Sequence, residues 1–113
     1  MGNLGLGNIT FHNQTTTAST GLEYNVAYSS VSTIELEILG TATSHSITLE
    51  GKIKDNWYPI SGVKVVDYST TVDGVITTKN ALWQVDVTGL IGFRTNLTAV
   101  SGGNITVLGR AVR

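Results

Sequence analysis

The sequence predicts an all-β fold, a single antiparallel β-sandwich, jelly-roll-like, with about nine short strands. Thr, Ser, Asn and Gly supply 17, 9, 8 and 13 of the 113 residues, which favours strands and the turns between them. Short segments alternate between apolar and polar residues with a period of two, and turn residues separate these segments. No segment of 11 or more residues repeats its apolar positions with the period of a helix.

The strongest alternation lies in residues 33–39, 45–54 and 81–87. Every second residue of these segments is apolar, so we expect these residues to face the core and the intervening ones to face solvent. Gly51 falls on the inward side and marks a bulge or a close contact. The expected inward side chains are Ile34, Leu36, Ile38, Ile47, Leu49, Ile53, Trp83, Val85 and Val87.

Alternation also predicts strands at residues 9–12, 22–28, 93–99 and 104–112. Residues 13–21 are polar and rich in Thr, which is typical of a loop or a weak edge strand. The residues expected to share the apolar faces of these strands are Ile9, Phe11, Leu22, Tyr24, Val26, Tyr28, Phe93, Thr95, Leu97, Ala99, Ile105 and Val107.

Two turns are expected in the middle of the chain. Asp73-Gly74 separates segments rich in β-forming residues, 63–72 and 75–78, and predicts a type I′ hairpin with Val72 opposite Val75. Asp55-Asn56 turns the chain toward Trp57, and Pro59 confines the strand that follows to an edge or a bulge.

The length allows one domain, and we expect residues 1–7, which hold three glycines, to form a flexible arm before a single sandwich at 8–113. Seven basic residues balance eight acidic ones, which argues against a nucleic-acid or polybasic membrane partner. We expect no signal peptide, because the first residues lack a basic segment followed by a long apolar one.

The titratable residues predict no catalytic, cofactor-binding or metal-binding site, so we expect a protein that is not an enzyme and carries no cofactor. His12 and His45 lie far apart and are interpreted as surface residues, since a zinc site needs three or four ligands. Glu35 and Glu37 share one strand face about 7 Å apart, a pairing that can hydrolyse glycosides, but without companion groups it is typical of a solvated face. Asp86 is a candidate for pairing with Arg94 on a neighbouring strand.

Aromatic residues offer the other route to function. Trp57 and Tyr58 follow a predicted turn, and one of them must point away from the core of a regular strand, which makes both candidates for ligand or partner contact. Trp83 belongs to a buried alternation instead. Only 13% of the residues are charged, and such a neutral surface suits a subunit covered by its neighbours in an assembly.

Four segments resemble small β-sandwich virion proteins of tailed bacteriophages, of the head-decoration or tail/baseplate accessory type. Residues 46–51 and 55–60 resemble a strand ending in Glu-Gly, a turn, and Trp-x-Pro-Ile. Residues 83–94 resemble the element Val-Asp-Val-x-Gly-Leu followed by Arg, and residues 101–107 resemble the closing strand. The resemblance implies a structural or adhesive role in a virion and carries no catalytic residues.

Two functions therefore stay open. The first is a non-enzymatic virion structural protein, made in the host cytoplasm, that oligomerises, for example as a trimer, and docks on major capsid or tail proteins. The second is a carbohydrate-binding module or host-surface adhesion domain that contacts a host glycan through Trp57 and Tyr58.

Overall fold

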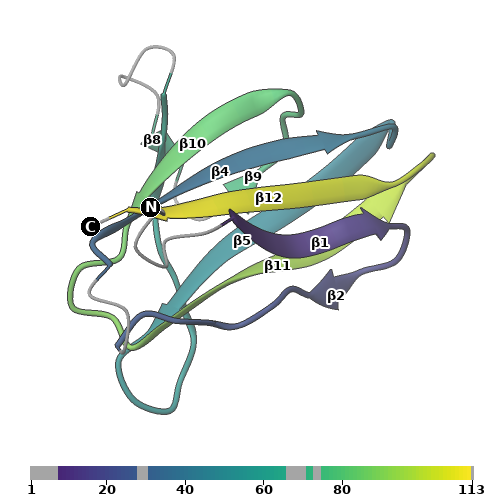
Figure 1. Ribbon diagram of the computed structural model, residues 1–113. Coiled ribbons are helices and arrows are strands. Elements are labelled where there is room, and N and C mark those ends of the chain that lie inside the picture. Colours follow the sequence, from purple (N-terminus) through teal and green to yellow (C-terminus); the bar gives the residue numbers. More distant parts are fainter. Residues whose placement is uncertain (1–7, 28–30, 66–70, 73–74, 113) are drawn as a thin grey trace.

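The computed structural model describes residues 8–27, 31–65, 71–72 and 75–112, and these residues form twelve strands and no helix. The expected arm at residues 1–7 lies outside the described residues. The strands form two six-stranded antiparallel sheets packed face to face (Figure 1), so the predicted β-sandwich is confirmed. The strand number exceeds the expected nine because several strands have only two residues. The described residues include no helix that could cross a bilayer.

The first sheet, called sheet A, is continuous across six strands. Its spatial order is β1 (Asn8–Thr15), β12 (Ile105–Val112), β4 (Thr33–Gly40), β10 (Ala81–Asp86), β7 (Gly62–Lys64) and β8 (Thr71–Val72).

The second sheet, called sheet B, is built on two long strands. Its order is β2 (Ser19–Thr20), β11 (Gly92–Ser101), β5 (Ser44–Lys52) and β6 (Tyr58–Pro59), with β3 (Tyr24–Asn25) pairing β11 and β9 (Val75–Ile76) pairing β5. The long strands alternate between the sheets, since the chain crosses from β4 to β5, from β10 to β11 and from β11 to β12. Pro59 lies in β6, at the edge of sheet B, as predicted.

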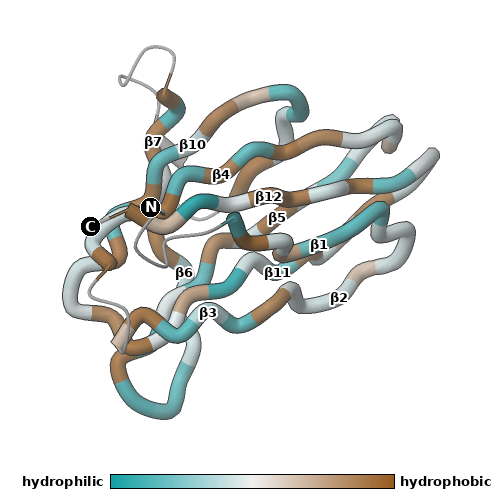
Figure 2. The backbone as a smooth tube through the Cα atoms, viewed as in Figure 1, coloured by the Kyte–Doolittle hydropathy of each residue, from teal (hydrophilic) through white to brown (hydrophobic). Residues whose placement is uncertain are grey.

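The core lies between the sheets and follows the alternation of the sequence, visible as brown segments recurring along the strands in Figure 2. Phe11 and Phe93 pack edge to face across the sheets, with ring centroids 5.6 Å apart. The fully buried side chains from the predicted segments are Ile34, Leu36, Ile38, Ile47, Leu49, Trp83, Val85, Val87, Phe93, Leu97, Ile105 and Val107.

The predicted close contact at Gly51 is confirmed, because a Cβ there would lie 2.6 Å from Cδ1 of Leu90. Leu90 itself packs against the core from the loop before β11. Ala99, expected to face inward, is exposed instead. The pairing of β11 with β5 shifts register between Leu97 and Ala99, and such a shift reverses the faces of the residues that follow.

The predicted hairpin between residues 63–72 and 75–78 is wrong. Strand β8 pairs β7 in sheet A, with Gly62 opposite Val72, whereas β9 pairs β5 in sheet B, with Ile47 opposite Ile76. Ile76 is fully buried there, so contacts with the core decide its partner and override the local turn signal. The Asp73-Gly74 turn itself lies outside the described residues.

Besides Ala99, two large apolar residues expected to lie on a buried face are exposed. Leu22 lies before β3, which covers only Tyr24–Asn25 of the predicted strand 22–28. Ile53 follows the last residue of β5, where the strand pairing ends. In both cases the alternation of apolar and polar residues extends past the end of the strand, so no neighbouring strand covers the apolar side chain. Tyr28 lies outside the described residues.

Candidate interaction surfaces

Trp57 lies in the five-residue loop between β5 and β6, called the 53–57 loop, and packs on the outer face of sheet B. A Cβ on Gly92 of β11 would lie 3.3 Å from Cη2 of Trp57, so the missing side chain makes room for the ring. Cζ of Arg94 lies 4.2 Å from the ring centroid and Nζ of Lys52 lies 4.8 Å from it. These cation–π contacts hold the indole against the sheet.

The charges around Trp57 are paired with one another. Nε of Arg94 donates to Oε1 of Glu50 at 2.7 Å, and Nδ2 of Asn96 lies 3.4 Å from the other oxygen of that carboxylate. Nζ of Lys52 forms an ion pair with Glu23 at 2.9 Å. We call Glu50, Arg94, Lys52 and Trp57 the paired cluster, and its contacts hold Trp57 against the outer face of sheet B.

The predicted pairing of Arg94 with Asp86 is wrong, because the two residues lie on β11 and β10, in different sheets. The carboxylate of Asp86 instead accepts a hydrogen bond from the backbone N–H of Thr88 at 2.9 Å. That hydrogen bond lowers the pKa of Asp86, which marks it as a turn-stabilising residue.

Tyr58 is the more accessible of the two predicted contact residues. Its side chain is 59% exposed and lies at a small hollow of about 200 Å³ with four residues of the 53–57 loop. Trp57 and Tyr58 both lie outside the buried core but have different surroundings, since Trp57 packs against the rest of the paired cluster whereas Tyr58, the first residue of β6, is exposed.

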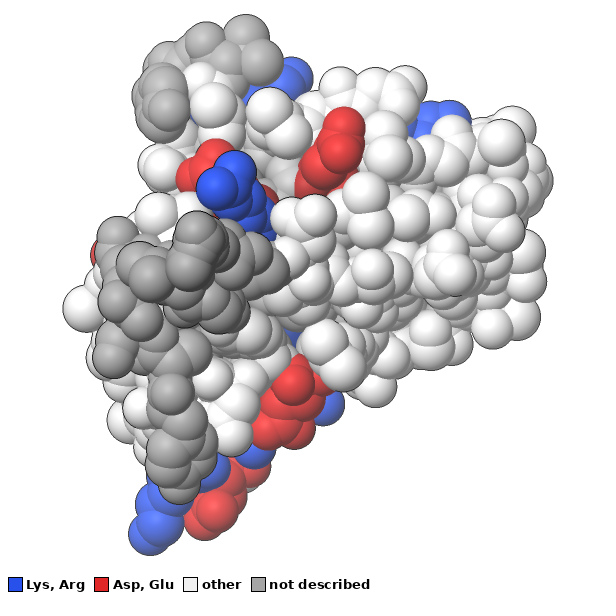
Figure 3. Space-filling view, in the orientation of Figure 1, with Lys and Arg blue, Asp and Glu red and all other residues white. Residues whose placement is uncertain are grey.

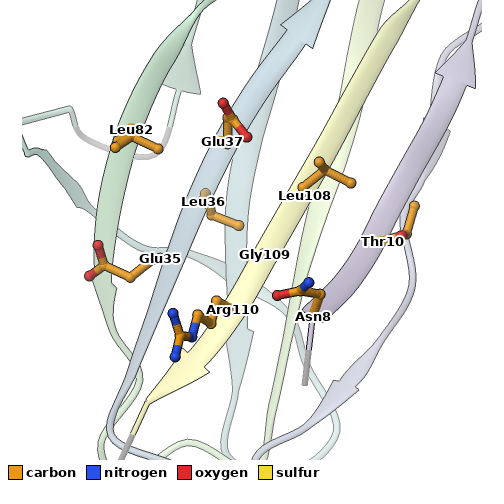
Figure 4. Close-up of a pocket in the computed structure, with 9 residues that line it drawn as sticks. All are labelled: Asn8, Thr10, Glu35, Leu36, Glu37, Leu82, Leu108, Gly109 and Arg110. Atoms are coloured by element: carbon orange, nitrogen blue, oxygen red, sulfur yellow. The ribbon is translucent and has the colours of Figure 1, made fainter. Parts of the chain in front are cut away.

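A larger hollow of about 530 Å³ lies on the outer face of sheet A (Figure 4). The register aligns Leu108 of β12, Glu37 of β4 and Leu82 of β10 in one row across three strands. In the next row, Arg110 lies beside Glu35, whose carboxylate accepts a 2.8 Å hydrogen bond from Nε2 of Gln84. The full lining is Asn8, Thr10, Glu35, Leu36, Glu37, Leu82, Leu108, Gly109 and Arg110.

We call this the sheet A hollow, and two of its charges have no partner in the described part of the chain. Glu37 and Arg110 form no side-chain hydrogen bond or ion pair with another described residue. Leu82, beside Glu37, is 45% exposed although it is a large apolar residue. The alternation predicts outward positions for Glu37 and Leu82. It cannot predict that the two side chains are neighbours, because they meet only through the pairing of β4 with β10.

Both histidines are buried, so their interpretation as surface residues is wrong. His12 is 4% exposed, and its Nε2 lies 3.4 Å from the carbonyl oxygen of Thr95. Burial lowers the pKa of His12, and the hydrogen bond to Thr95 opposes the shift. His45 is 5% exposed, and burial together with the charge of Lys79 lowers its pKa. No cluster of three or more metal-ligating residues occurs in the described part of the chain.

Charge is distributed unevenly over the face that sheet A presents. In Figure 3 the charged atoms gather on one half and along the lower rim, whereas the end formed by the β4–β5 and β11–β12 turns is almost uncharged. Residues 41–46 and 101–106, in and around those turns, include no Asp, Glu, Lys or Arg.

Comparison with solved structures first defines the class of protein, a phage-derived β-sandwich protein. The SPBc2 prophage-derived protein YomS has a TM-score of 0.84 and 25% identity, covering 95% of this chain and 92% of YomS. The PBSX exported protein XepA has a TM-score of 0.86 and 27% identity, covering 93% of this chain and 37% of XepA. The affiliation with phage proteins implied by the resemblance is thus confirmed.

The chain belongs to the XepA family, whose model matches residues 6–111. The uncharacterised protein YqxG of Bacillus subtilis (strain 168) is 32% identical over 107 residues, which are 92% of this chain and 34% of YqxG. The chain therefore spans about a third of the length of YqxG and XepA and nearly all of YomS.

Proposed function

We propose that this chain is a non-enzymatic structural protein of a phage particle, a head-decoration or tail/baseplate accessory subunit, that oligomerises and docks on other virion proteins. Its relation to prophage proteins supports the phage setting. The single observation that carries the proposal is the exposure of large apolar side chains on a surface poor in charge. These side chains are Leu22, Ile53, Tyr58, Val75, Leu82, Ile91 and Val112.

Exposed apolar side chains of this kind are buried when a subunit meets a neighbour. In a free monomer, by contrast, charged residues normally separate them and resist association. The low charge of this chain removes much of that resistance.

The experiment compares particles of the phage that encodes this chain with particles from which its gene has been deleted. We expect washed wild-type particles to contain the chain at a fixed copy number. Purified chain added to the deleted particles should then sediment with them up to the same copy number. Absence of the chain from washed particles, together with no saturable binding, would contradict the proposal.

The exposure of Tyr58 favours a second candidate, glycan binding by Trp57 and Tyr58. Aromatic rings stack on sugars, and the hollow beside Tyr58 offers Lys54, Asp55 and Asn56 as polar neighbours. Calorimetric titration with host cell-wall saccharides should give binding that Tyr58→Ala abolishes while the fold stays intact. If the wild-type chain binds none of these saccharides, glycan binding is rejected.

A further inference from the structure

We propose that His12 makes one edge of the sandwich open in acid: when its imidazole gains a second proton, residues 16–23 detach from strands β1 and β11. We call residues 16–23 the edge segment. The inference concerns the conformation of a single chain, so it is independent of docking in a virion. It is carried by a buried histidine that lies under a segment with few contacts of its own.

The edge segment joins the two sheets at the side of the sandwich formed by β1 and β2 (Figure 1). The N–H of Gly21 donates to the carbonyl oxygen of Thr95 in β11 at 2.7 Å. The N–H of Leu22 donates to the carbonyl oxygen of Phe11 in β1 at 3.3 Å. Strand β2, which belongs to the edge segment, pairs only two residues with β11.

Little holds the edge segment in place. Each of its residues is exposed except Gly21, which is half-buried, so none of its side chains contributes to the core. It is attached by the backbone hydrogen bonds above and by the ion pair between Glu23 and Lys52. Segments with few buried contacts open at a much lower free energy than the whole domain does.

His12 lies directly under this segment. The pairing of β1 with β12 shifts register beside His12, which allows both Phe11 and His12 to face inward. Nε2 of His12 lies 3.4 Å from the carbonyl oxygen of Thr95, the same oxygen that Gly21 binds, and a Cβ on Gly21 would lie 2.8 Å from that nitrogen. Because a carbonyl oxygen only accepts, Nε2 carries the proton of the neutral ring, and Nδ1 takes the second proton in acid.

No carboxylate offsets the charge that acid would place on His12. The charged residues of the elements packed against it are held elsewhere, and β1 and β2 contain no other titratable residue. They are Glu23 of the edge segment, which pairs with Lys52, Arg94 of β11, which pairs with Glu50, and Arg110 of β12, which lines the sheet A hollow. Burial lowers the pKa of His12 and only the hydrogen bond to Thr95 opposes this shift, so the protonated ring is more stable in water than under the segment.

Opening of the edge segment exposes His12 to water and returns its pKa toward the ordinary value of about 6.5. The open form then binds the second proton more tightly than the closed form. The ratio of open to closed chains is therefore constant well above pH 6.5. Below it, the ratio rises by up to about tenfold per pH unit until the folded pKa is reached.

The first experiment measures amide hydrogen exchange by NMR from pH 8 to pH 5, expressed as protection factors so that the intrinsic pH dependence of exchange is removed. The amides of Gly21 and Leu22 should lose about fivefold or more of their protection between pH 7 and pH 5. The amide of Leu36, in the centre of sheet A, should stay at least about a hundredfold better protected at each pH, because it exchanges only when the domain unfolds.

Replacing the histidine tests whether it is the group that responds. His12→Gln keeps an N–H donor for Thr95 but does not titrate, so the protection of Gly21 should no longer depend on pH. His45→Gln makes the same change at the other buried histidine and should leave the response of Gly21 as in wild type. His12→Asn supplies a second neutral side chain if His12→Gln does not fold.

Gly21→Ala should open the edge segment without acid. Its Cβ would lie 2.8 Å from both Nε2 of His12 and the carbonyl oxygen of Phe11, which is closer than real Cβ contacts. We expect protection of the Leu22 amide to fall by about tenfold or more at pH 8. Thr20→Ala, at an exposed position of the same segment, should change it by less than about threefold.

Four results would overturn the inference. Equal protection of Gly21, Leu22 and Leu36 would mean that the edge opens only when the whole domain unfolds. Protection of Gly21 that is independent of pH in the wild type, or a response that persists in His12→Gln, would remove the role of His12. Unchanged protection in Gly21→Ala at pH 8 would show that the edge segment does not rest on His12. The particle-binding experiment tests the virion role separately, since none of these measurements depends on it.

Discussion

The outer faces of the two sheets carry similar residue types but use them differently. On sheet B, Glu50 pairs with Arg94 and the indole of Trp57 lies against both Arg94 and Lys52. On sheet A, Glu37 and Arg110 line a hollow and have no side-chain partner among the described residues. Charges paired within the chain stabilise the fold, whereas charges left unpaired beside exposed leucines are available to another molecule. Variants on sheet B should therefore change stability, and variants on sheet A should change association.

The largest loss of stability is expected from a substitution at the floor of the sheet A hollow. This position is an exception to the contrast between the two faces. A Cβ on Gly109 would lie 2.5 Å from Cε2 of Phe11, whose ring packs on Phe93. Gly109→Ala should therefore cost about 2–3 kcal/mol of unfolding free energy, as overpacking of a core does. Urea denaturation measures this loss, and Leu108→Ala on the wall of the same hollow is the control. Equal losses for both variants would mean that the wall is structural too.

Trp57→Ala is the next largest change and tests the sheet B side of the comparison. Loss of a half-buried indole with two cation contacts should lower the unfolding free energy by about 2 kcal/mol. Tyr58→Ala removes an exposed ring from the adjacent position and should stay within about 0.5 kcal/mol of wild type. Thermal or urea unfolding of the two variants measures this difference in stability. A Trp57 variant as stable as wild type would show that the paired cluster does not hold the loop.

Removing one carboxylate from each face gives the most direct comparison. Glu50→Ala leaves Arg94 without its ion pair and should destabilise the chain by about 1 kcal/mol, since the pair is only partly buried. Glu37→Ala should leave stability within about 0.5 kcal/mol of wild type. The difference should shrink in high salt, which screens the pair on sheet B. If Glu37→Ala is the more damaging variant, the assignment of the two faces is reversed.

The smallest change in stability is expected from pH. It determines the pH at which the other variants should be compared. His12 and His45 have lowered pKa values in the folded chain, so the unfolded chain binds protons more tightly. Their contribution to stability is complete above the unfolded pKa of about 6.5 and is lost as the pH falls through that value toward the folded pKa.

Urea midpoints should thus decrease from pH 8 to pH 5, and His12→Asn with His45→Asn should flatten the dependence. Asp86 does not interfere, because its lowered pKa places its own loss of stability at more acidic pH. A midpoint that rises as the pH falls would contradict the sign.

The sequence was sufficient for those parts of the fold in which local alternation and burial agree. Ile34, Leu36 and Ile38 alternate over a stretch of β4 that is paired with a strand on each side, so the pattern and the core coincide. At Ile53 the alternation outlasts the strand, and the prediction of burial is wrong for that reason. At Val72 and Val75 a strong hairpin signal is overridden, because β8 pairs with the preceding strand β7 and β9 pairs with β5 in the other sheet.

The interaction surfaces were harder to predict, because they depend on register. Trp57 and Tyr58 could be found from a local turn signal. Leu82, Glu37 and Arg110 lie on three strands separated by many residues of chain, and only the pairing of β10 and β12 with β4 brings them together. An apolar residue on an outward position, such as Leu82, was the available signal, and it becomes informative once its neighbours across the sheet are known.

Strands β1 and β12 pair with Asn8 opposite Arg110, so the first and last described strands leave the sandwich at the same edge of sheet A. A unit whose ends emerge together can be inserted into a longer polypeptide, or repeated in tandem, without rearranging its core. This gives a structural basis for modular reuse, since relatives such as YqxG and XepA match this chain over only about a third of their length.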